Sequence, residues 1–143
     1  MKVIGKLFLG LAASVFSVTA IAADFDGSKA LMCSFARIIE CDAGSMCTPT
    51  TNESVDAPDF FKLDFKKKQV IGISAGVEGP PDDIDKVTDL AKFVVVQGVQ
   101  GGAEGASDTL AWSASINHET GAMVVTGSGE NAGFVVFGVC TTI

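Results

Sequence analysis

Histidine and tyrosine are nearly absent from this 143-residue sequence, which contains one histidine and no tyrosine. Histidine is the side chain whose charge ordinarily changes near neutral pH, so a lone His118 in a predicted turn offers no partner for acid–base catalysis. The four cysteines show no C-x-x-C spacing, which makes a zinc site of cysteine and histidine ligands a poor prediction. The sequence therefore predicts a non-enzymatic protein without a metal or cofactor.

Basic residues are also few, with 10 lysines and arginines against 17 aspartates and glutamates and a net charge of −7. Binding to nucleic acid requires a basic surface that neutralises phosphates, so nucleic acid is not an expected partner. Anionic membrane surfaces are disfavoured for the same reason. The acidic balance permits a cationic protein partner, although solubility alone accounts for an acidic surface.

The first 23 residues have the pattern of a cleaved secretory signal peptide. Lys2 and Lys6 form a charged region, Val3–Val18 is mostly apolar, and a cleavage site of mainly small residues follows at Ala20–Ala23. This order of charge, apolar run and small residues is typical of a signal peptide rather than of a membrane span. We expect residues 24–143 to form one exported domain, periplasmic or secreted, without stable membrane insertion.

Period-two alternation of apolar and polar residues dominates the remaining chain and is clearest in Leu110–Cys140. Alternation of this kind predicts half-buried β-strands, and the turn residues between the runs predict hairpins. The eight predicted strands are Leu31–Glu40, Phe61–Phe65, Gln69–Ser74, Ile84–Thr88, Lys92–Val99 and three strands within Leu110–Cys140. Their spacing predicts an all-β fold, a small eight-stranded antiparallel up-and-down barrel of the lipocalin or avidin type.

Three segments are rich in turn residues and are predicted to be irregular. They are Cys41–Pro58, Ala75–Asp83 with its two adjacent prolines, and Gly101–Ser107. Uninterrupted alternation in the first strand would place five residues on one face: Leu31, Cys33, Phe35, Arg37 and Ile39.

An even number of cysteines in an exported chain predicts two disulfides, for which three connectivities are possible. Closure of an up-and-down barrel places the last strand antiparallel to the first, so that the start of one lies beside the end of the other. This arrangement favours a Cys33–Cys140 bond. Cys41 lies at the far end of the first strand and would then pair locally with Cys47.

Several motifs resemble functional sites without the context that such sites need. Gly72–Gly76 matches G-x-S-x-G, but the glycine and prolines that follow cannot begin the helix that a nucleophile elbow requires. Four aspartates cluster on or near a loop, yet their spacing is not that of an EF-hand: Asp82, Asp83, Asp85 and Asp89. Catalytic and metal-ligating roles are therefore not predicted for these motifs.

Aromatic residues supply the most probable binding feature, either as the lining of an apolar cavity or as the filling of a solid core. The candidates are Trp112, Phe61, Phe65, Phe93, Phe134 and Phe137. We expect a module that binds a small, partly apolar ligand. The alternative is a protein-interaction or inhibitor module that uses its acidic surface against a cationic protein.

A set of short motifs resembles a family of small exported proteins of Gram-negative bacteria with no assigned function. The motifs are Asp24–Lys29, Glu40–Asp42, Asp64–Lys68, Trp112–Ser113, Thr120–Gly121, Met123 and Phe134–Thr141. The resemblance implies export to the periplasm and supplies no catalytic residues. The turn Gly127-Ser128-Gly129 is also similar to a turn in periplasmic inhibitors of C-type lysozyme, which is the basis of the inhibitor alternative.

Overall fold

The computed structural model describes residues 25–44, 46–101 and 109–143, and this part of the chain is all-β. The predicted signal peptide, residues 1–23, lies outside the described residues, as does the predicted loop over 101–107 apart from Gly101. Among the residues described, no helix has the length and apolar character needed to cross a membrane.

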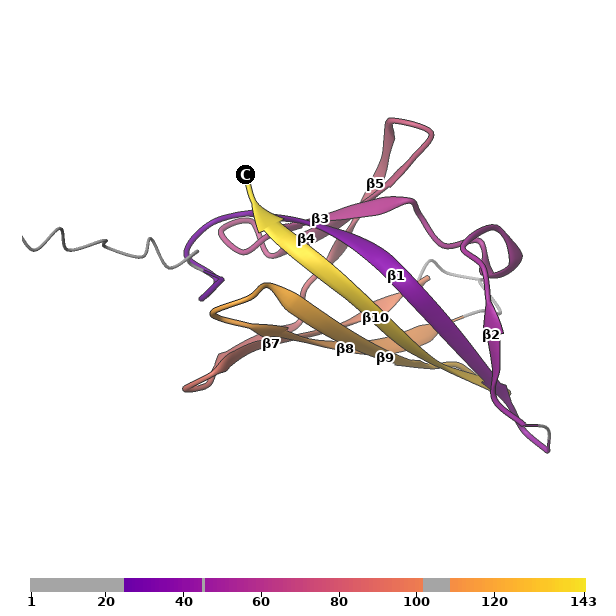
Figure 1. Cartoon of the computed structure of the whole chain (residues 1–143). Coiled ribbons are helices and arrows are strands. Elements are labelled where there is room, and N and C mark those ends of the chain that lie inside the picture. The colour runs from indigo at the N-terminus through magenta and orange to yellow at the C-terminus, as the bar shows by residue number, and fades with distance from the viewer. Residues whose placement is uncertain (1–24, 45, 102–108) are drawn as a thin grey trace, which may run out of the picture.

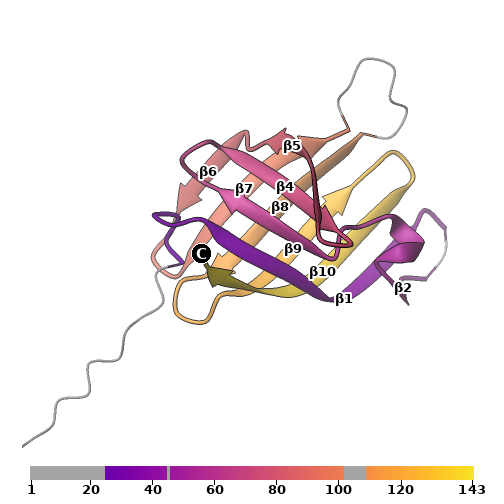
Figure 2. The ribbon, with the colours of Figure 1, turned by 90° about the horizontal axis from the view of Figure 1, so that it is seen from above.

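Ten antiparallel strands form a single curled sheet, and one short 3₁₀ helix lies between the second and third strands of the chain (Figures 1 and 2). The elements are β1 (Leu31–Asp42), β2 (Thr48–Thr50), η1 (Glu53–Val55), β3 (Phe60–Asp64), β4 (Gln69–Ser74), β5 (Val77–Asp83), β6 (Lys86–Asp89), β7 (Phe93–Gln100), β8 (Leu110–Asn117), β9 (Ala122–Ser128) and β10 (Ala132–Thr142). The sheet order is β5-β4-β3-β1-β10-β9-β8-β7-β6, and β2 pairs with Ile38–Glu40 in the second half of β1. Alternating sequence thus produces antiparallel neighbours, as expected, in a curled half-barrel.

The sheet differs from the predicted eight-stranded barrel in its strand count and in its closure. β2 and β5 lie in segments predicted to be irregular, and the path of nine hydrogen-bonded strands ends at β5 on one side and β6 on the other. These two edge strands follow each other in the chain. At the corner between them, the Ile84 N–H donates to the Lys68 carbonyl at 2.8 Å and the Asp85 N–H donates to the Gln97 carbonyl at 2.9 Å. The two edges therefore meet at one corner.

Pro80 and Pro81 are compatible with β5 because β5 is an edge strand. A proline has no N–H to donate, which excludes it from a central strand but not from an edge or a bulge. The pairing of β4 with β5 shifts register between Ile71 and Ile73, opposite these prolines. The prediction that Ala75–Asp83 is irregular was wrong because the proline rule was applied as though the segment lay inside a sheet.

A β-bulge in β1 changes which residues face the interior. The pairing with β10 shifts register between Phe35 and Arg37, so one additional residue is inserted into β1. An inserted residue reverses the alternation beyond it. Ile38 is consequently buried, with 3% of its surface exposed, whereas Arg37 is exposed. The expectation that Arg37 and Ile39 continue the inward face of β1 was therefore wrong.

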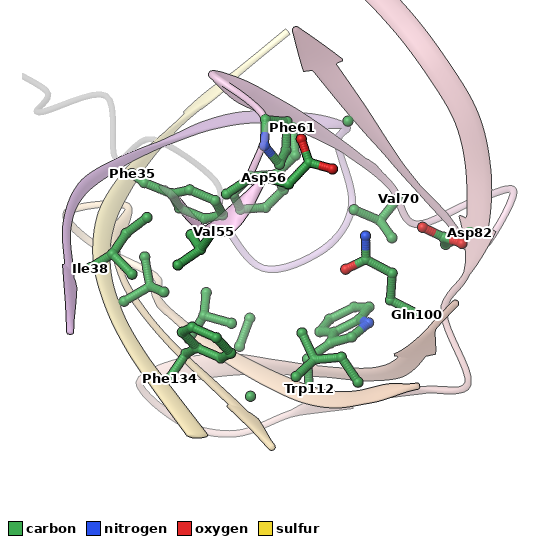
Figure 3. A pocket seen from close by; sticks show the side chains of 18 of the residues that line it. Phe35, Ile38, Val55, Asp56, Phe61, Val70, Asp82, Gln100, Trp112 and Phe134 are labelled. Carbon is green, nitrogen blue, oxygen red and sulfur yellow. The ribbon is translucent and has the colours of Figure 1, made fainter. Parts of the chain in front are cut away.

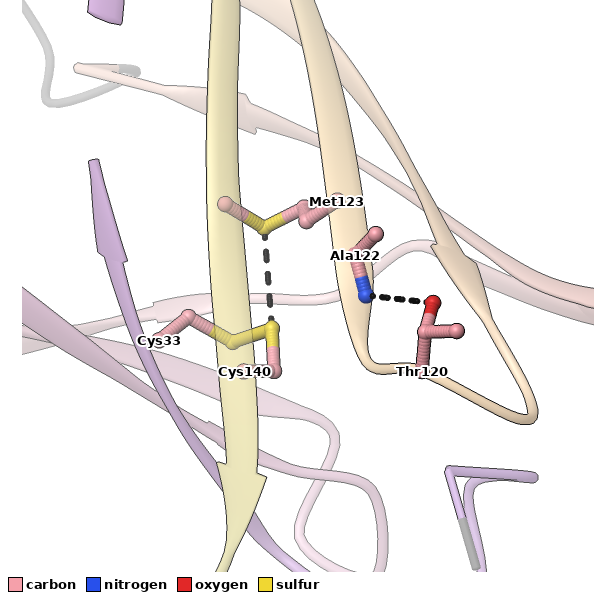
Figure 4. The surroundings of a disulfide bond; sticks show 5 residues. All are labelled: Cys33, Thr120, Ala122, Met123 and Cys140. Atoms are coloured by element: carbon pink, nitrogen blue, oxygen red, sulfur yellow. Dashed lines mark hydrogen bonds between the residues drawn. A yellow bond between two sulfur atoms is a disulfide. The ribbon is translucent and has the colours of Figure 1, made fainter. Parts of the chain in front are cut away.

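The disulfides join Cys33 to Cys140 and Cys41 to Cys47, the two pairs favoured by the strand order. Cys33 and Cys140 are directly opposed where β1 pairs with β10, and both are buried. The Cys140 Sγ atom lies 3.7 Å from the Met123 Sδ atom (Figure 4), which is a packing contact because a disulfide sulfur carries no proton. The bond ties the last strand to the first.

One end of the half-barrel is filled by side chains. The buried cluster there comprises Phe25, Leu31, Cys33, Phe61, Leu63, Ile84, Val94, Val96, Ile116, Met123 and Cys140. Phe25 lies against the turn between β8 and β9, where Gly121 has a φ of 67°. A Cβ atom on Gly121 would come 2.5 Å from the Cys140 carbonyl oxygen and 2.7 Å from Phe25 Cζ. The turn therefore requires glycine for both its conformation and its packing.

Candidate functional site

The opposite half of the interior is hollow, and the cross-strand register shows why. Residues of four strands oppose one another in inward-facing rows. A row at the filled end includes the large side chains of Ile116 and Met123. The next row has Ala114 at its centre, and the row beyond that alternates aromatic residues with glycines. Small residues at these positions leave space that their neighbours do not fill.

The resulting cavity has a volume of about 200 Å³ and lies within the curled sheet (Figure 3). Most of the residues that line it are aliphatic or aromatic, and the polar ones are Asp56, Asp82 and Gln100. The full lining is Phe35, Ile38, Val55, Asp56, Ala57, Pro58, Phe61, Leu63, Val70, Gly72, Asp82, Gln100, Leu110, Trp112, Ala114, Val125, Gly127, Phe134 and Val136. An apolar hollow with a few polar groups is the usual form of a small-molecule site.

Trp112 is positioned by the absence of a side chain at the facing position of β7. Gly98 on β7 and Gly127 on β9 are directly opposite Trp112 on β8. A Cβ atom on Gly98 would lie 2.7 Å from Trp112 Cζ2 and 2.8 Å from the Asp83 carbonyl oxygen. The indole ring therefore occupies space that any other residue at position 98 would take. Phe134 on β10 is opposite Gly127, which continues the alternation.

The segment after β2 closes one side of the cavity with residues of η1 and the turn that follows. Asn52 organises this turn, because its side-chain amide donates to the Pro58 carbonyl at 3.0 Å and its own carbonyl accepts from Ala57 N–H at 2.9 Å. Asp56 has a φ of 50° at the end of η1, a left-handed conformation that aspartate tolerates better than most residues. Its carboxylate lines the cavity from this turn.

The charged groups of the cavity are both acidic. Asp82 on β5 is partly buried, whereas Asp56 and Gln100 are exposed and mark the mouth. Burial raises the pKa of the Asp82 carboxyl above its ordinary value of 3.8, and the charge of Asp83 raises it further. No lysine, arginine or histidine is among the lining residues that the structure describes. Figure 3 shows Gln100 and Asp82 at one side of the cavity, with Trp112 and Phe134 along another.

The six predicted pocket residues separate into three groups. Trp112, Phe61 and Phe134 line the cavity. Phe65 packs against the filled end of the core instead. Phe93 and Phe137 are 40% and 43% exposed. Each is next in sequence to an inward-facing valine, Val94 or Val136, and successive residues of a strand point to opposite faces, so both lie on the outer face of the sheet.

The motifs for which the sequence predicts no catalytic or metal-binding role do not form such a site in the described structure. In the G-x-S-x-G motif, Ala75 and Gly76 form a tight turn between β4 and β5 with φ values of 49° and 77°, and β5 follows in place of a helix. His118 Nε2 lies 3.2 Å from Asp89 Oδ1 at the filled end. Nothing in the described chain gives a positive sign of catalysis, and its His, Cys, Asp and Glu side chains form no group of three that could hold a metal.

Sequence reasoning missed Asp56, Asp82 and Gln100 as cavity residues. Asp82 was considered only as a member of the acidic loop cluster, because the prolines before it argued against a strand. Its spacing does carry a signal, since Asp82 precedes the buried Ile84 by two residues and so shares a strand face with it. Gln100 lies an even number of residues after the inward-facing Val94 and Val96, and so shares their strand face. Asp56 has no such signal, because it lies in a turn.

Three comparisons with known proteins were made, against family models, curated proteins and solved structures. None of them finds a match to this chain.

Proposed function

We propose that this protein binds a small, partly apolar molecule in the cavity of its half-barrel and acts as a non-enzymatic binding module. The observation that carries the proposal is the cavity of about 200 Å³ beside a core that is otherwise close-packed. Globular proteins fill their interiors to the density of organic crystals, so a hollow of this size has a considerable packing cost. Binding of a ligand would recover the lost contacts.

The cavity volume limits the size of the ligand. An engineered apolar cavity of about 150 Å³ binds benzene, so about 200 Å³ accommodates one aromatic ring with a short substituent. The wall offers aromatic faces from Trp112, Phe61 and Phe134 for such a ring. We propose that the curled sheet surrounds its ligand as a closed lipocalin- or avidin-like barrel does.

A pair of matched variants on one strand tests the proposal. Ala114 faces the cavity and is 2% exposed, whereas Ala111 on the same strand is exposed on the outer face. Ala114→Leu fills part of the cavity, and Ala111→Leu adds the same atoms outside it. With phenethyl alcohol as the ligand and Trp112 fluorescence as the signal, we expect Ala114→Leu to weaken binding at least about tenfold. Ala111→Leu should bind as the natural protein does, and equal loss in both variants would contradict the proposal.

The interaction or inhibitor alternative ranks second because the interior is not solid. It draws on the outer face, where Phe137 and Val139 on β10 are 43% and 51% exposed beside Val124 on β9. These side chains are not accompanied by acidic residues in the paired positions of β9, so the acidic surface that the alternative requires lies elsewhere. The cavity is therefore the better-supported site.

We also propose that the protein acts in the periplasm or outside the cell. Two disulfides fit an exported protein, because such bonds persist in oxidising compartments. Fractionation of cells that express the full chain tests this location. Mass spectrometry of the recovered protein should give a chain that begins near Asp24 with four oxidised cysteines, and full-length reduced chain in the cytosol would refute it.

A further inference from the structure

We propose that the cavity selects an organic cation, a ligand with an ammonium group attached to a single apolar or aromatic ring. This inference rests on the proposed function and adds the chemical class of the ligand. Its basis is the combination of an apolar, aromatic interior with carboxylates at the edge and no basic group among the described residues of the lining.

The acidic groups come from separate parts of the chain and reach the same cavity. Asp56 belongs to the turn after η1, and Asp82 belongs to β5, opposite Val70 of β4. Gln100 adds an amide whose oxygen accepts hydrogen bonds, and it lines the same cavity as Asp82 (Figure 3). An ammonium group donates only, so carboxylate and amide oxygens match its requirements, whereas an anionic ligand would meet repulsion from both aspartates.

The bulge in β1 is consistent with this charge preference. If β1 paired with β10 in regular register, without the bulge, Arg37 would continue the inward face of β1 in the position that Ile38 occupies. Ile38 instead lines the cavity, and Arg37 is exposed on the outer face. A guanidinium group inside would neutralise the carboxylates and would exclude a cationic ligand. The bulge therefore keeps the cavity walls apolar and its net charge negative.

The aromatic lining supports the same ligand class. Trp112, Phe61 and Phe134 line the cavity, and the face of an aromatic ring attracts a cation within about 6 Å. The absence of a side chain at Gly98 leaves the space that the indole of Trp112 occupies. Carboxylates together with aromatic faces are a recurrent way to recognise ammonium groups. The same ring faces accommodate the apolar part of the ligand.

Three commercially available probes separate charge from shape. Phenethylamine, phenethyl alcohol and hydrocinnamate share a phenyl ring and a two-carbon arm, and they carry an ammonium, a hydroxyl and a carboxylate group. We expect phenethylamine to bind at least about tenfold more tightly than phenethyl alcohol at low ionic strength, because one charge-assisted hydrogen bond contributes about that much. Hydrocinnamate should bind more weakly than the alcohol. Dissociation constants follow from the fluorescence of Trp112, the sole tryptophan of the chain.

Asp82→Asn and Asp83→Asn form a matched pair of variants for this experiment. Both remove one negative charge from adjacent positions of β5, but Asp82 lines the cavity and Asp83 does not. Asp82→Asn should lower the preference for amine over alcohol, the ratio of the two dissociation constants, by about tenfold. Asp83→Asn should change neither constant by more than about twofold. Asp56→Asn, an exposed position in a turn, gives an independent variant with the same expectation as Asp82→Asn.

The possible results separate this inference from the proposed function. If the alcohol binds, Ala114→Leu abolishes that binding and the amine binds no better, the cation preference is wrong while the binding function stands. If Asp82→Asn and Asp83→Asn reduce amine affinity equally, the attraction comes from the overall negative charge and the inference is overturned. If no probe binds, or if Ala114→Leu leaves the affinities unchanged, both proposals are overturned.

Discussion

The Cys33–Cys140 bond is expected to stabilise the fold far more than the Cys41–Cys47 bond, because the two close loops of very different length. Their sequence separations are 107 and 6 residues. In the chain-entropy description, the first loop corresponds to about 5 kcal/mol of stabilisation and the second to about 2 kcal/mol. Cys33 and Cys140 are also buried, so their replacement by alanine removes packed atoms in addition. The first bond thus contributes an amount comparable to the whole stability of a small domain.

The measurement compares two double variants, Cys33→Ala/Cys140→Ala and Cys41→Ala/Cys47→Ala, by urea unfolding followed through Trp112 fluorescence. With similar m-values, the loss in midpoint should be at least about twofold larger for the first variant than for the second. If the first variant does not fold in buffer, adding sucrose raises the stability of both variants so that they can be compared on one scale. An equal loss in both variants, or a larger loss for Cys41→Ala/Cys47→Ala, would refute the argument that the β1–β10 seam holds the chain ends together.

Two further predictions concern glycine packing and pH. Gly121→Ala should lower the free energy of unfolding by about 3 kcal/mol, because it combines a positive φ with a clash against the Cys140 carbonyl. Gly76→Ala also places alanine at a positive φ, but in open space, and should lower the free energy of unfolding by only about 1 kcal/mol. Thermal unfolding of both variants measures the difference, and equal losses would contradict the packing argument. The raised pKa of Asp82 means that the folded protein binds a proton at this carboxyl more readily than the unfolded chain does. Ionised Asp82 therefore destabilises the fold. This penalty decreases as the pH falls through the raised pKa and is absent below the unfolded value of 3.8. Asp82→Asn should therefore be more stable than the natural protein at pH 7, by less than about 1 kcal/mol because the carboxylate remains largely hydrated, and the two should converge near pH 3. A lower stability of Asp82→Asn at pH 7, measured by urea unfolding, would show that the carboxylate makes a favourable interaction in the folded protein.

The strand pattern was predictable from the sequence because an antiparallel sheet with one buried face produces period-two alternation. Gln69–Ser74 was predicted with the bounds that β4 has, and Leu110–Cys140 contains β8, β9 and most of β10. The β1–β10 seam followed from the positions of Cys33 and Cys140 within their strands. These inferences succeeded because they depend on local pattern and on chain direction.

The features that shape the cavity were not predictable in the same way. A bulge such as the one before Arg37 has no required residue type, so nothing in the residue pattern indicates where the alternation is interrupted. Pro80 and Pro81 were compatible with a strand only if that strand lay at an edge, which is a property of the whole sheet. The hollow beside Ala114 depends on which rows of four strands oppose one another.

The two prolines of β5 have a consequence for the behaviour of this protein at high concentration. A sheet with a free edge exposes backbone donors and acceptors that a strand from another molecule can pair with, which is a common route to fibrous aggregation. Along β5, Pro80 and Pro81 have no N–H to donate, and the charges of Asp82 and Asp83 follow directly. At the other edge, β6 has four residues and carries Lys86 and Asp89 at its ends. Neither edge is therefore a good template for an incoming strand, and we expect the half-barrel to resist edge-to-edge aggregation at high concentration.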